Sequence, residues 1–393
     1  MAAVRRALLI NLDFRDFVYS YLWGRAVLDG CARRQLAVDV VTVHPSAGRH
    51  LAAELGVAPN AVEPRLDGSV AYLEQPDEAG SRRAVGQLLE RHRYDTVIVN
   101  CEAPLFLHLL LERGAELGAA RWLVYDRHLH VELCPHERDA ELRRRMSAAR
   151  LDVFTLAEIA AGRPDQPAAP PAWRRWLDTL RRAPPAMTPR GEDTMILRAF
   201  RRLLPAQRIH LQPWPMDDAF FAPQADVGRG DRFVVFTGGD SGRDYATLCA
   251  AVDGLPLELR ICAARPPERL PSNATLLPRL ALHQFRDEVA RAAVVAVPLT
   301  GAPPVSGITV IAMARMLARP VIATDSPVVR MHVPRADAGA YLVPRGDAPA
   351  LRTQLCRLLE APAESEQLAR RAHAQAAATL SLRAFVERML ESA

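Results

Sequence analysis

The sequence predicts an α/β protein made of two halves, each with a parallel sheet, that face each other across a cleft. Short apolar runs alternate with helical stretches along both halves of the chain, which is typical of repeated β-α-β units. The apolar runs are nearly continuous, as expected for strands whose two faces are both covered by helices. A segment rich in proline separates the two series of elements. Two Rossmann-like halves with a linker therefore form the predicted architecture.

The length of 393 residues allows two or three domains. We expect an N-terminal domain over residues 1–204, a linker over 205–225 and a C-terminal domain over 226–380. Residues 161–190 are rich in proline and alanine, which favours a surface insertion in the first domain. A closing helix over 381–393 is placed to pack back on the N-terminal domain.

The first half begins with a strand over Ala7–Leu12, a helix over Tyr19–Arg34 and a second strand over Ala37–Val43. The loop after the first strand lacks the GxGxxG sequence, so the dinucleotide fingerprint is absent. Residues 46–80 are predicted to be irregular. Further strands are expected over 95–100, 122–125, 151–155 and 208–211, and helices over 82–93, 104–117 and 191–204.

The second half repeats the alternation of strands and helices. Strands are expected over 233–236, 257–263, 294–298, 321–323 and 341–343, and helices over 245–252, 283–292, 365–380 and 382–391. A further short helix follows residue 307 and ends at Arg319-Pro320, and another helix begins at Gly346-Asp347.

Composition excludes several kinds of chemistry. All 50 basic residues are arginine, so a lysine Schiff base and a P-loop lysine are both excluded. The net charge of +5 is spread along the chain without a basic arm, which argues against nucleic acid as a partner. A basic surface suits anionic substrates, and also peripheral contact with an anionic membrane. The six scattered cysteines fit reduced thiols in a cytoplasmic protein.

The sequence around Ser306, Gly307 and Thr309 predicts an anion site. These small polar residues stand where a helix begins, and the first N–H groups of a helix, including that of Ile308, suit a diphosphate. Gly307 lets a ligand approach the backbone closely. An ordinary helix cap is the alternative interpretation.

Three segments occur in an order that is found in a known family. They are the loop Phe236–Tyr245, the ending Tyr341–Asp347 and the linker Ile209–Pro213 with Phe221–Pro223. These segments resemble the C-terminal domain and linker of nucleotide-sugar-dependent glycosyltransferases of the GT-B fold, of the retaining family-4-like type. The resemblance covers about residues 205–390, and it extends to the first half only in layout.

The resemblance implies a site for a nucleotide-diphosphate sugar. Arg243 stands at the position of the family's basic phosphate-binding residue, which gives it a catalytic role. No metal and no cofactor besides the donor substrate are expected. The other residues assigned to the donor are Gly238, Gly239, Ser241, Arg279, Leu280, Ser306, Gly307, Ile308 and Thr309.

One departure from the family concerns two glutamates spaced E-x7-E. Pro303 and Ile311 occupy their places in this sequence, and neither side chain can hold a sugar hydroxyl. Donor recognition must therefore differ from the family pattern, or activity is lost.

Polar loops of the first half are expected on the acceptor side. His128 is assigned a catalytic contact with the donor sugar or acceptor hydroxyl, and Asp126 and His130 come from the same loop. Asp13 and Arg15 follow the first strand and border the same cleft. Each of these residues has an ordinary surface role as its alternative, and His128 and His130 with Cys134 and His136 are also a weak candidate zinc set.

The sequence therefore predicts a metal-independent, retaining glycosyltransferase that moves a sugar from a nucleotide-diphosphate donor. The acceptor is unknown, and a glycan, a lipid-linked molecule and a small natural product all remain open. A catalytically inactive binding or partner protein is the first alternative, because the glutamates are missing. Another GT-B enzyme, such as a nucleotide-sugar epimerase, is the second.

Overall fold

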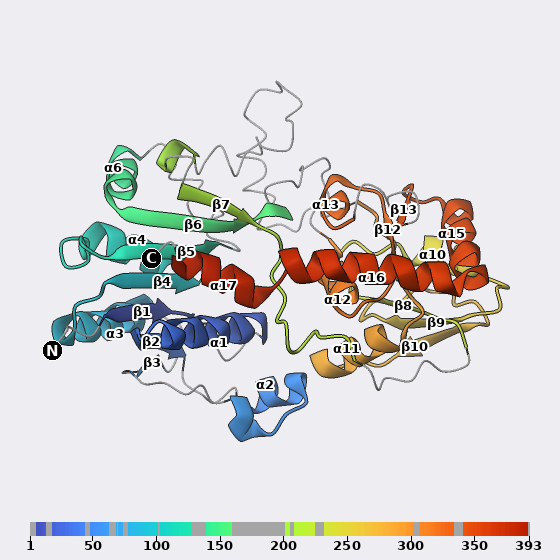
Figure 1. Ribbon diagram of the computed structural model, residues 1–393, viewed down its shortest axis with the longest axis horizontal. Helices are drawn as coiled ribbons and strands as arrows, with labels where there is room; N and C mark the ends of the chain where they lie inside the picture. The colour runs from blue at the N-terminus through green and yellow to red at the C-terminus, as the bar shows by residue number, and fades with distance from the viewer. Residues whose placement is uncertain are drawn as a thin grey trace. The chain divides into compact units, whose positions relative to one another are not determined.

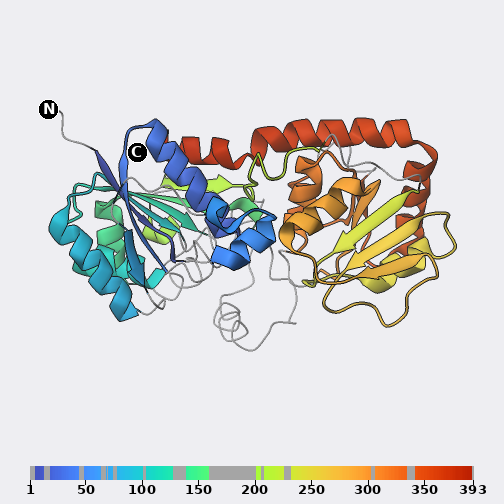
Figure 2. The ribbon, with the colours of Figure 1, turned by 90° about the horizontal axis from the view of Figure 1, so that it is seen from below.

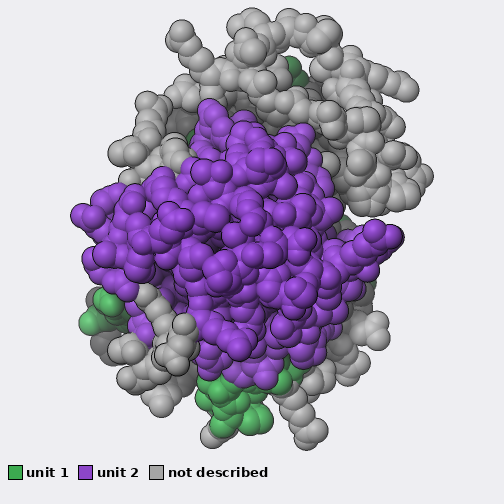
Figure 3. Space-filling view, turned by 90° about the vertical axis from the view of Figure 1, so that its right-hand side faces the viewer, with its two compact units in different colours: residues 1–160, 188–212, 382–393 green, residues 161–187, 213–381 purple. Residues whose placement is uncertain are grey.

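The computed structural model describes residues 5–12, 18–43, 48–62, 68, 70–73, 78–100, 103–126, 139–158, 201–204, 208–224, 232–301, 306–333 and 341–391. These residues form two compact units (Figure 3). The first unit holds the described residues up to Gln212 together with 382–391, and the second holds those from Pro213 to Ser381. Each unit contains one sheet in which every pair of neighbouring strands is parallel (Figure 1). The α/β class with two parallel sheets is confirmed.

The sheet of the first unit has the order β3-β2-β1-β4-β5-β6-β7. Near-continuous runs of Val, Leu and Ile make these strands, because both faces of the sheet are covered. Its strands are β1 (Arg6–Ile10), β2 (Ala37–Val43), β3 (Val70–Leu73), β4 (Thr96–Asn100), β5 (Arg121–Asp126), β6 (Arg150–Leu156) and β7 (Ile209–Gln212). Its helices are α1 (Val18–Arg33), α2 (Gly48–Leu55), η3 (Pro59–Val62), α3 (Glu78–Arg91), α4 (Ala103–Glu112), α6 (Ala140–Ala148) and α17 (Leu382–Glu391).

Two groups of helices cover the first sheet. Helices α3, α4 and α6 pack on one face, where Leu88, Phe106 and Met146 join the side chains of the central strands in a continuous core. Helices α1 and α17 pack together on the other face (Figure 2). There Tyr125 of β5 stacks on Trp23 of α1 at 5.4 Å between ring centroids, and Phe385 of α17 lies 5.2 Å from the Tyr125 ring. The last helix of the chain is thus part of the first unit.

The sheet of the second unit has the order β10-β9-β8-β11-β12-β13. Helices α10 and α15 pack together, and α12 packs with α11 and α16. The strands are β8 (Val234–Gly238), β9 (Glu258–Cys262), β10 (Ala274–Leu277), β11 (Val294–Val297), β12 (Val321–Thr324) and β13 (Leu342–Val343). The helices are α10 (Tyr245–Val252), α11 (Leu282–Arg291), α12 (Ile308–Met316), α13 (Pro327–Arg330), α15 (Ala348–Glu360) and α16 (Pro362–Thr379).

Most predicted elements agree with the structure within a few residues, but the prediction for residues 46–80 was wrong. Residues 46–80 are not irregular, because they include α2, η3 and β3. Three elements, α6, α13 and β10, were not expected at all. The strands β3 and β10 are edge strands of their sheets, and they form by pairing with β2 and β9. Among the described helices, none is long and apolar enough to cross a bilayer.

Candidate functional site

The order of strands gives the second sheet a topological switch point, where open α/β sheets usually form a ligand crevice at the carboxyl ends of the strands. The chain leaves β8 toward β9 and β10 on one side, and β11 pairs with β8 on the other side. The loops after β8 and β11 therefore diverge from the carboxyl ends of neighbouring parallel strands, where ligands of open α/β sheets usually bind. Gly238 ends β8, and Gly307 immediately precedes α12, which follows β11. The predicted donor residues in these two loops thus lie at this switch point.

Hydrogen bonds hold the two loops together. The hydroxyl groups of Ser241 and Ser306 are 3.3 Å apart. The backbone N–H of Thr300 donates to the Gly242 carbonyl at 2.9 Å, and that of Asp244 donates to the Pro298 carbonyl at 3.0 Å. Segments that lie more than fifty residues apart in the sequence therefore form one framework.

Arg243 lies inside this framework. Its Nε donates to the Gly238 carbonyl at 2.9 Å, and its Nη1 donates to the Ser241 carbonyl at 2.9 Å. A Cβ atom placed on Gly239 would be 2.9 Å from Arg243 Nη2, and one on Gly307 would be 3.4 Å from Nη1. The guanidinium therefore packs between the two glycines. Burial lowers the pKa of Arg243, but an arginine stays protonated at neutral pH.

Helix α12 begins at the switch point. Gly307 is its N-cap residue with φ of +79°, a left-handed conformation that favours glycine, and no side chain caps the helix by a hydrogen bond. Backbone N–H groups of the first turn are therefore available to an anion, and the helix dipole adds positive potential. Thr309 is half-buried, whereas Ser306 and Ile308 are buried. Ser306 and Ile308 would therefore contact a ligand mainly through their backbone, and the Ser306 hydroxyl also holds the loop of Ser241 in place.

The loop after β9 is fastened to the loop after β8. Asp240 Oδ1 accepts hydrogen bonds from the N–H groups of Ala264 at 2.8 Å and Arg265 at 3.1 Å. Tyr245 Oη donates to the carbonyl of Gly239. Both interactions use polar groups of the Gly-rich loop for its own shape, so Asp240 is a structural residue here.

Arg279 and Leu280 follow β10, two strands away from β8 in the sheet. The Cys262 thiol at the end of β9 donates to the Pro278 carbonyl at 3.6 Å, which fixes the start of this loop. Arg279 is exposed and Leu280 is half-buried. These two predicted donor residues thus follow the carboxyl end of a strand of the same sheet as Gly238.

The structure adds Arg345, which the sequence analysis did not assign to the site. A Cβ atom on Gly301 would lie 2.2 Å from Arg345 Cζ, so this exposed guanidinium packs directly against the loop that follows β11. Gly301 has φ of +86°, which favours glycine at this contact. Arg345 belongs to the ending Tyr341–Asp347 that resembles the family. Its position in this ending was the signal by which the sequence could have identified it as a site residue.

The predicted residues of the first unit are described only in part. Asp126 ends β5, is fully buried, and accepts a hydrogen bond from Thr155 Oγ1 at 2.8 Å. His128, His130, Asp13 and Arg15 lie outside the described residues, so their roles stay predictions. Cys134 and His136 of the zinc alternative lie there too. Within the described ranges, no three His, Cys, Asp or Glu side chains are grouped as a metal site would need.

A buried amide pair marks the switch point of the first sheet. Asn100 Nδ2 at the end of β4 donates to Asn11 Oδ1, directly after β1, at 2.8 Å, and Asn11 Nδ2 donates to the Ser20 carbonyl at 3.1 Å. Both side chains are almost fully buried. The sequence analysis did not single them out, although an asparagine directly after each of two apolar runs was visible.

Comparison with known proteins identifies similar folds. No protein-family profile and no curated protein sequence matches the chain. Sucrose-phosphate synthase from Thermosynechococcus elongatus superposes with a TM-score of 0.58 at 17% identity, over 98% of both chains. Anabaena HepE in complex with UDP-glucose gives a TM-score of 0.56 at 13% identity, also over 98% of both chains. The spinosyn forosaminyltransferase SpnP gives 0.50 at 13% identity, over 99% of both. At these identities the likeness concerns the fold, which is that of GT-B proteins.

Proposed function

We propose that this protein is a glycosyltransferase that takes a sugar from a nucleotide diphosphate donor. The observation that carries the proposal is the position of the Arg243 guanidinium between Gly239 and Gly307, at the switch point of the second sheet. The fold supports it, because one structure with the same fold contains UDP-glucose and another contains UDP.

The chemistry follows from charge. In the transfer, the bond between the anomeric carbon and the diphosphate oxygen breaks, and the electron pair leaves with the diphosphate. Arg243 and the first-turn N–H groups of α12 would stabilise the negative charge that develops there. Gly239 and Gly307 have no side chain to keep the phosphates away from these donors. Arg345 would supply a second guanidinium on the side of the loop after β11.

We further propose that transfer needs no divalent metal and retains the configuration of the sugar. The two carboxylates of the Gly-rich loop are already engaged, since Asp240 accepts two backbone N–H groups and Asp244 caps α10. The positive charge of Arg243 can take the place of a metal at the diphosphate. The acceptor's hydroxyl oxygen forms the new bond to the anomeric carbon, and its proton neutralises the departing diphosphate.

A catalytically inactive binding protein is a second candidate, and one observation favours it. Ile311, which replaces a family glutamate, is 0% exposed within α12. Its side chain belongs to the core, so this position offers no polar contact to a sugar. The Gly-rich loop and the α12 N-terminus would bind a nucleotide diphosphate equally well in an enzyme and in an inactive relative.

A nucleotide screen separates these candidates. We expect UDP, GDP, dTDP or ADP to raise the melting temperature of the protein. Arg243→Ala should weaken the binding of that nucleotide at least about tenfold, since a charge-assisted hydrogen bond is worth about 1.5–3 kcal/mol. Arg150→Ala removes an exposed arginine from the first unit and serves as the control. Release of sugar from the matching nucleotide sugar supports the enzyme, and binding without release supports the inactive relative. If none of the four nucleotides binds, both candidate functions are overturned.

A further inference from the structure

A second pocket lies at the opposite edge of the same sheet. It has a volume of about 370 Å³ and is lined by Phe233, Ala293 and Pro320, which directly precede β8, β11 and β12. These are the amino ends of the strands, whereas the crevice is at their carboxyl ends. The five residues of β8 separate the two edges by about 16 Å at about 3.3 Å a residue. This pocket is therefore distinct from the candidate donor site.

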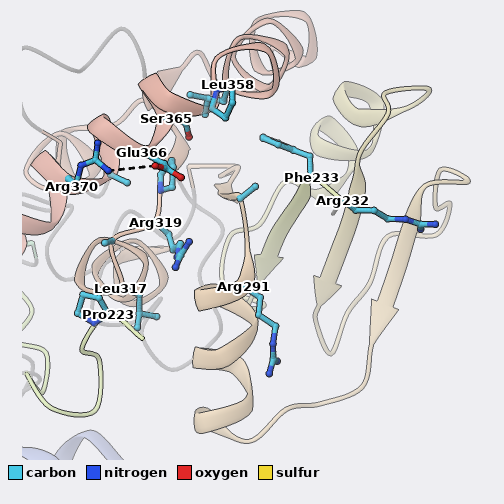
Figure 4. Close-up of a pocket in the computed structure, with 15 residues that line it drawn as sticks. Pro223, Arg232, Phe233, Arg291, Leu317, Arg319, Leu358, Ser365, Glu366 and Arg370 are labelled. Carbon is cyan, nitrogen blue, oxygen red and sulfur yellow. Dashed lines mark ion pairs between the residues drawn. The ribbon is translucent and has the colours of Figure 1, made fainter. Parts of the chain in front are cut away.

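Four arginines from separate segments line this pocket. They are Arg232 before β8, Arg291 at the end of α11, Arg319 between α12 and β12, and Arg370 on α16. Figure 4 shows Arg319 reaching into the middle of the group, whereas Arg232 and Arg291 extend outward. Arg319 is only 7% exposed, so a positive charge lies deep in the recess.

Negative charge on the pocket wall is small by comparison. Among the described lining residues, Glu366 alone carries a carboxylate, and its Oε2 lies 3.6 Å from Nη1 of the exposed Arg370 (Figure 4). Glu288 Oε1 also lies 3.6 Å from Arg291 Nη1, and four guanidiniums against these two carboxylates still leave an excess of positive charge. A recess lined by one sign of charge concentrates the potential and attracts ions of the other sign.

The other groups of the pocket suit a small phosphate ester. Helix α16 begins at Pro362 beside the recess, so the positive end of its dipole adds to the positive potential of the arginines. Ser365 supplies a hydroxyl, and Phe233 supplies an apolar wall. A volume of about 370 Å³ falls within the range of about 300–1,000 Å³ that is usual for small-molecule sites. Guanidinium groups bind phosphate through paired hydrogen bonds.

We infer that this pocket is a binding site for the phosphate group of a small organic phosphate, separate from the site of the transferred sugar. The phosphate lies near Arg319, and Arg370 pairs with Glu366 on the rim. Two sources share this chemistry, a soluble phosphate ester and the headgroup of an anionic lipid. The depth of Arg319 requires that the phosphate enter the recess, which a flat electrostatic contact with a membrane would not do.

Calorimetric titration of the full chain with glycerol 3-phosphate tests the inference. Arg291→Gln/Arg370→Gln changes two exposed arginines of the rim, so folding is preserved, and we expect affinity to fall at least tenfold. Arg319→Gln should abolish binding, with its melting curve recorded as a check on folding. Arg143→Gln/Arg150→Gln removes the same charge from exposed sites of the first unit and should leave affinity within twofold. Arg243→Gln should also leave it within twofold, which keeps this test independent of the donor site.

A second arm uses vesicles of phosphatidylglycerol, with phosphatidylcholine vesicles as the neutral control. Sedimentation of the protein with the anionic vesicles only, lost in the Arg291→Gln/Arg370→Gln variant, assigns the phosphate to a lipid headgroup. Binding of glycerol 3-phosphate without vesicle binding assigns it to a soluble ester. The inference is overturned if neither probe binds, or if the rim variant and the Arg143→Gln/Arg150→Gln control weaken binding equally.

Discussion

Replacement of Gly307 by alanine should disturb both the stability and the ligand site of the second unit. The residue has φ of +79°, and a left-handed conformation costs a non-glycine residue about 1–2 kcal/mol. The new Cβ would lie 2.7 Å from Val297 Cγ1 and 3.2 Å from Leu299 Cδ2, and such overpacking costs about 1–3 kcal/mol. We therefore expect a loss of about 2–5 kcal/mol in the free energy of unfolding. The same Cβ would be 3.4 Å from Arg243 Nη1, so nucleotide affinity should fall as the guanidinium shifts.

Gly254→Ala is the matched control for this substitution. Gly254 has φ of +71°, but a Cβ there would meet nothing within 4 Å, so only the conformational cost remains. Thermal melting and nucleotide titration of both variants separate strain from crowding. A change of 1 kcal/mol moves the melting temperature of a unit of this size by about 2–4 °C. If Gly307→Ala melts no lower than Gly254→Ala and binds nucleotide as the wild type does, the packing of Gly307 against Arg243 is refuted.

Three further predictions concern other parts of the chain. Ile311→Glu should destabilise the second unit by several kcal/mol, because the new carboxylate would be buried where a fully covered Ile lies. A glutamate that faced a bound ligand would cost little stability. Urea unfolding of the variant decides between the two. Phe385→Ala should lower the free energy of unfolding by about 3–5 kcal/mol in the same assay, and Glu387→Gln by under about 1 kcal/mol. The reason is that the buried ring of Phe385 holds α17 more strongly than the partly exposed ion pairs of Glu387 do. Similar losses from both variants would contradict this. Burial raises the pKa of the Cys31 thiol to about 12, so the folded state keeps a proton that the unfolded state loses above its own pKa of about 8.5. The stability of the wild type should therefore fall more steeply with rising pH than that of Cys31→Ala above this value, and parallel curves would contradict the shift.

The fold was predictable because long apolar strands carry a strong local signal. Runs such as residues 96–100 and 294–298 are buried on both faces, so their composition alone indicates parallel strands. The strands β3 and β10 were not predictable in this way. Residues of β10 such as Thr275 and Leu276 are exposed, and the strand exists because it pairs with β9. Pairing of this kind depends on tertiary structure, which local sequence does not encode.

The candidate site was predictable in its main parts and incomplete in its contacts. Gly307 was recognised from local sequence, since a glycine before a helix has a physical reason to bind phosphate, whereas Arg243 was assigned through the resemblance to a family. The approach of Arg345 to Gly301 joins loops more than forty residues apart, and it becomes visible only when the sheet is assembled. The pocket at the amino ends of the strands is of the same kind, because its four arginines come from four separate segments.

Hydrogen exchange of the backbone amides with and without nucleoside diphosphate tests the central claim most directly. The nucleotide is the one selected by the thermal screen, and the readout is the protection of each peptide segment. We predict that protection concentrates in residues 238–243 and 306–310, and that Arg243→Ala removes it from both segments together, because the guanidinium packs between Gly239 and Gly307. Protection elsewhere in the chain with these two segments unchanged would contradict the placement of the diphosphate at the α12 N-terminus.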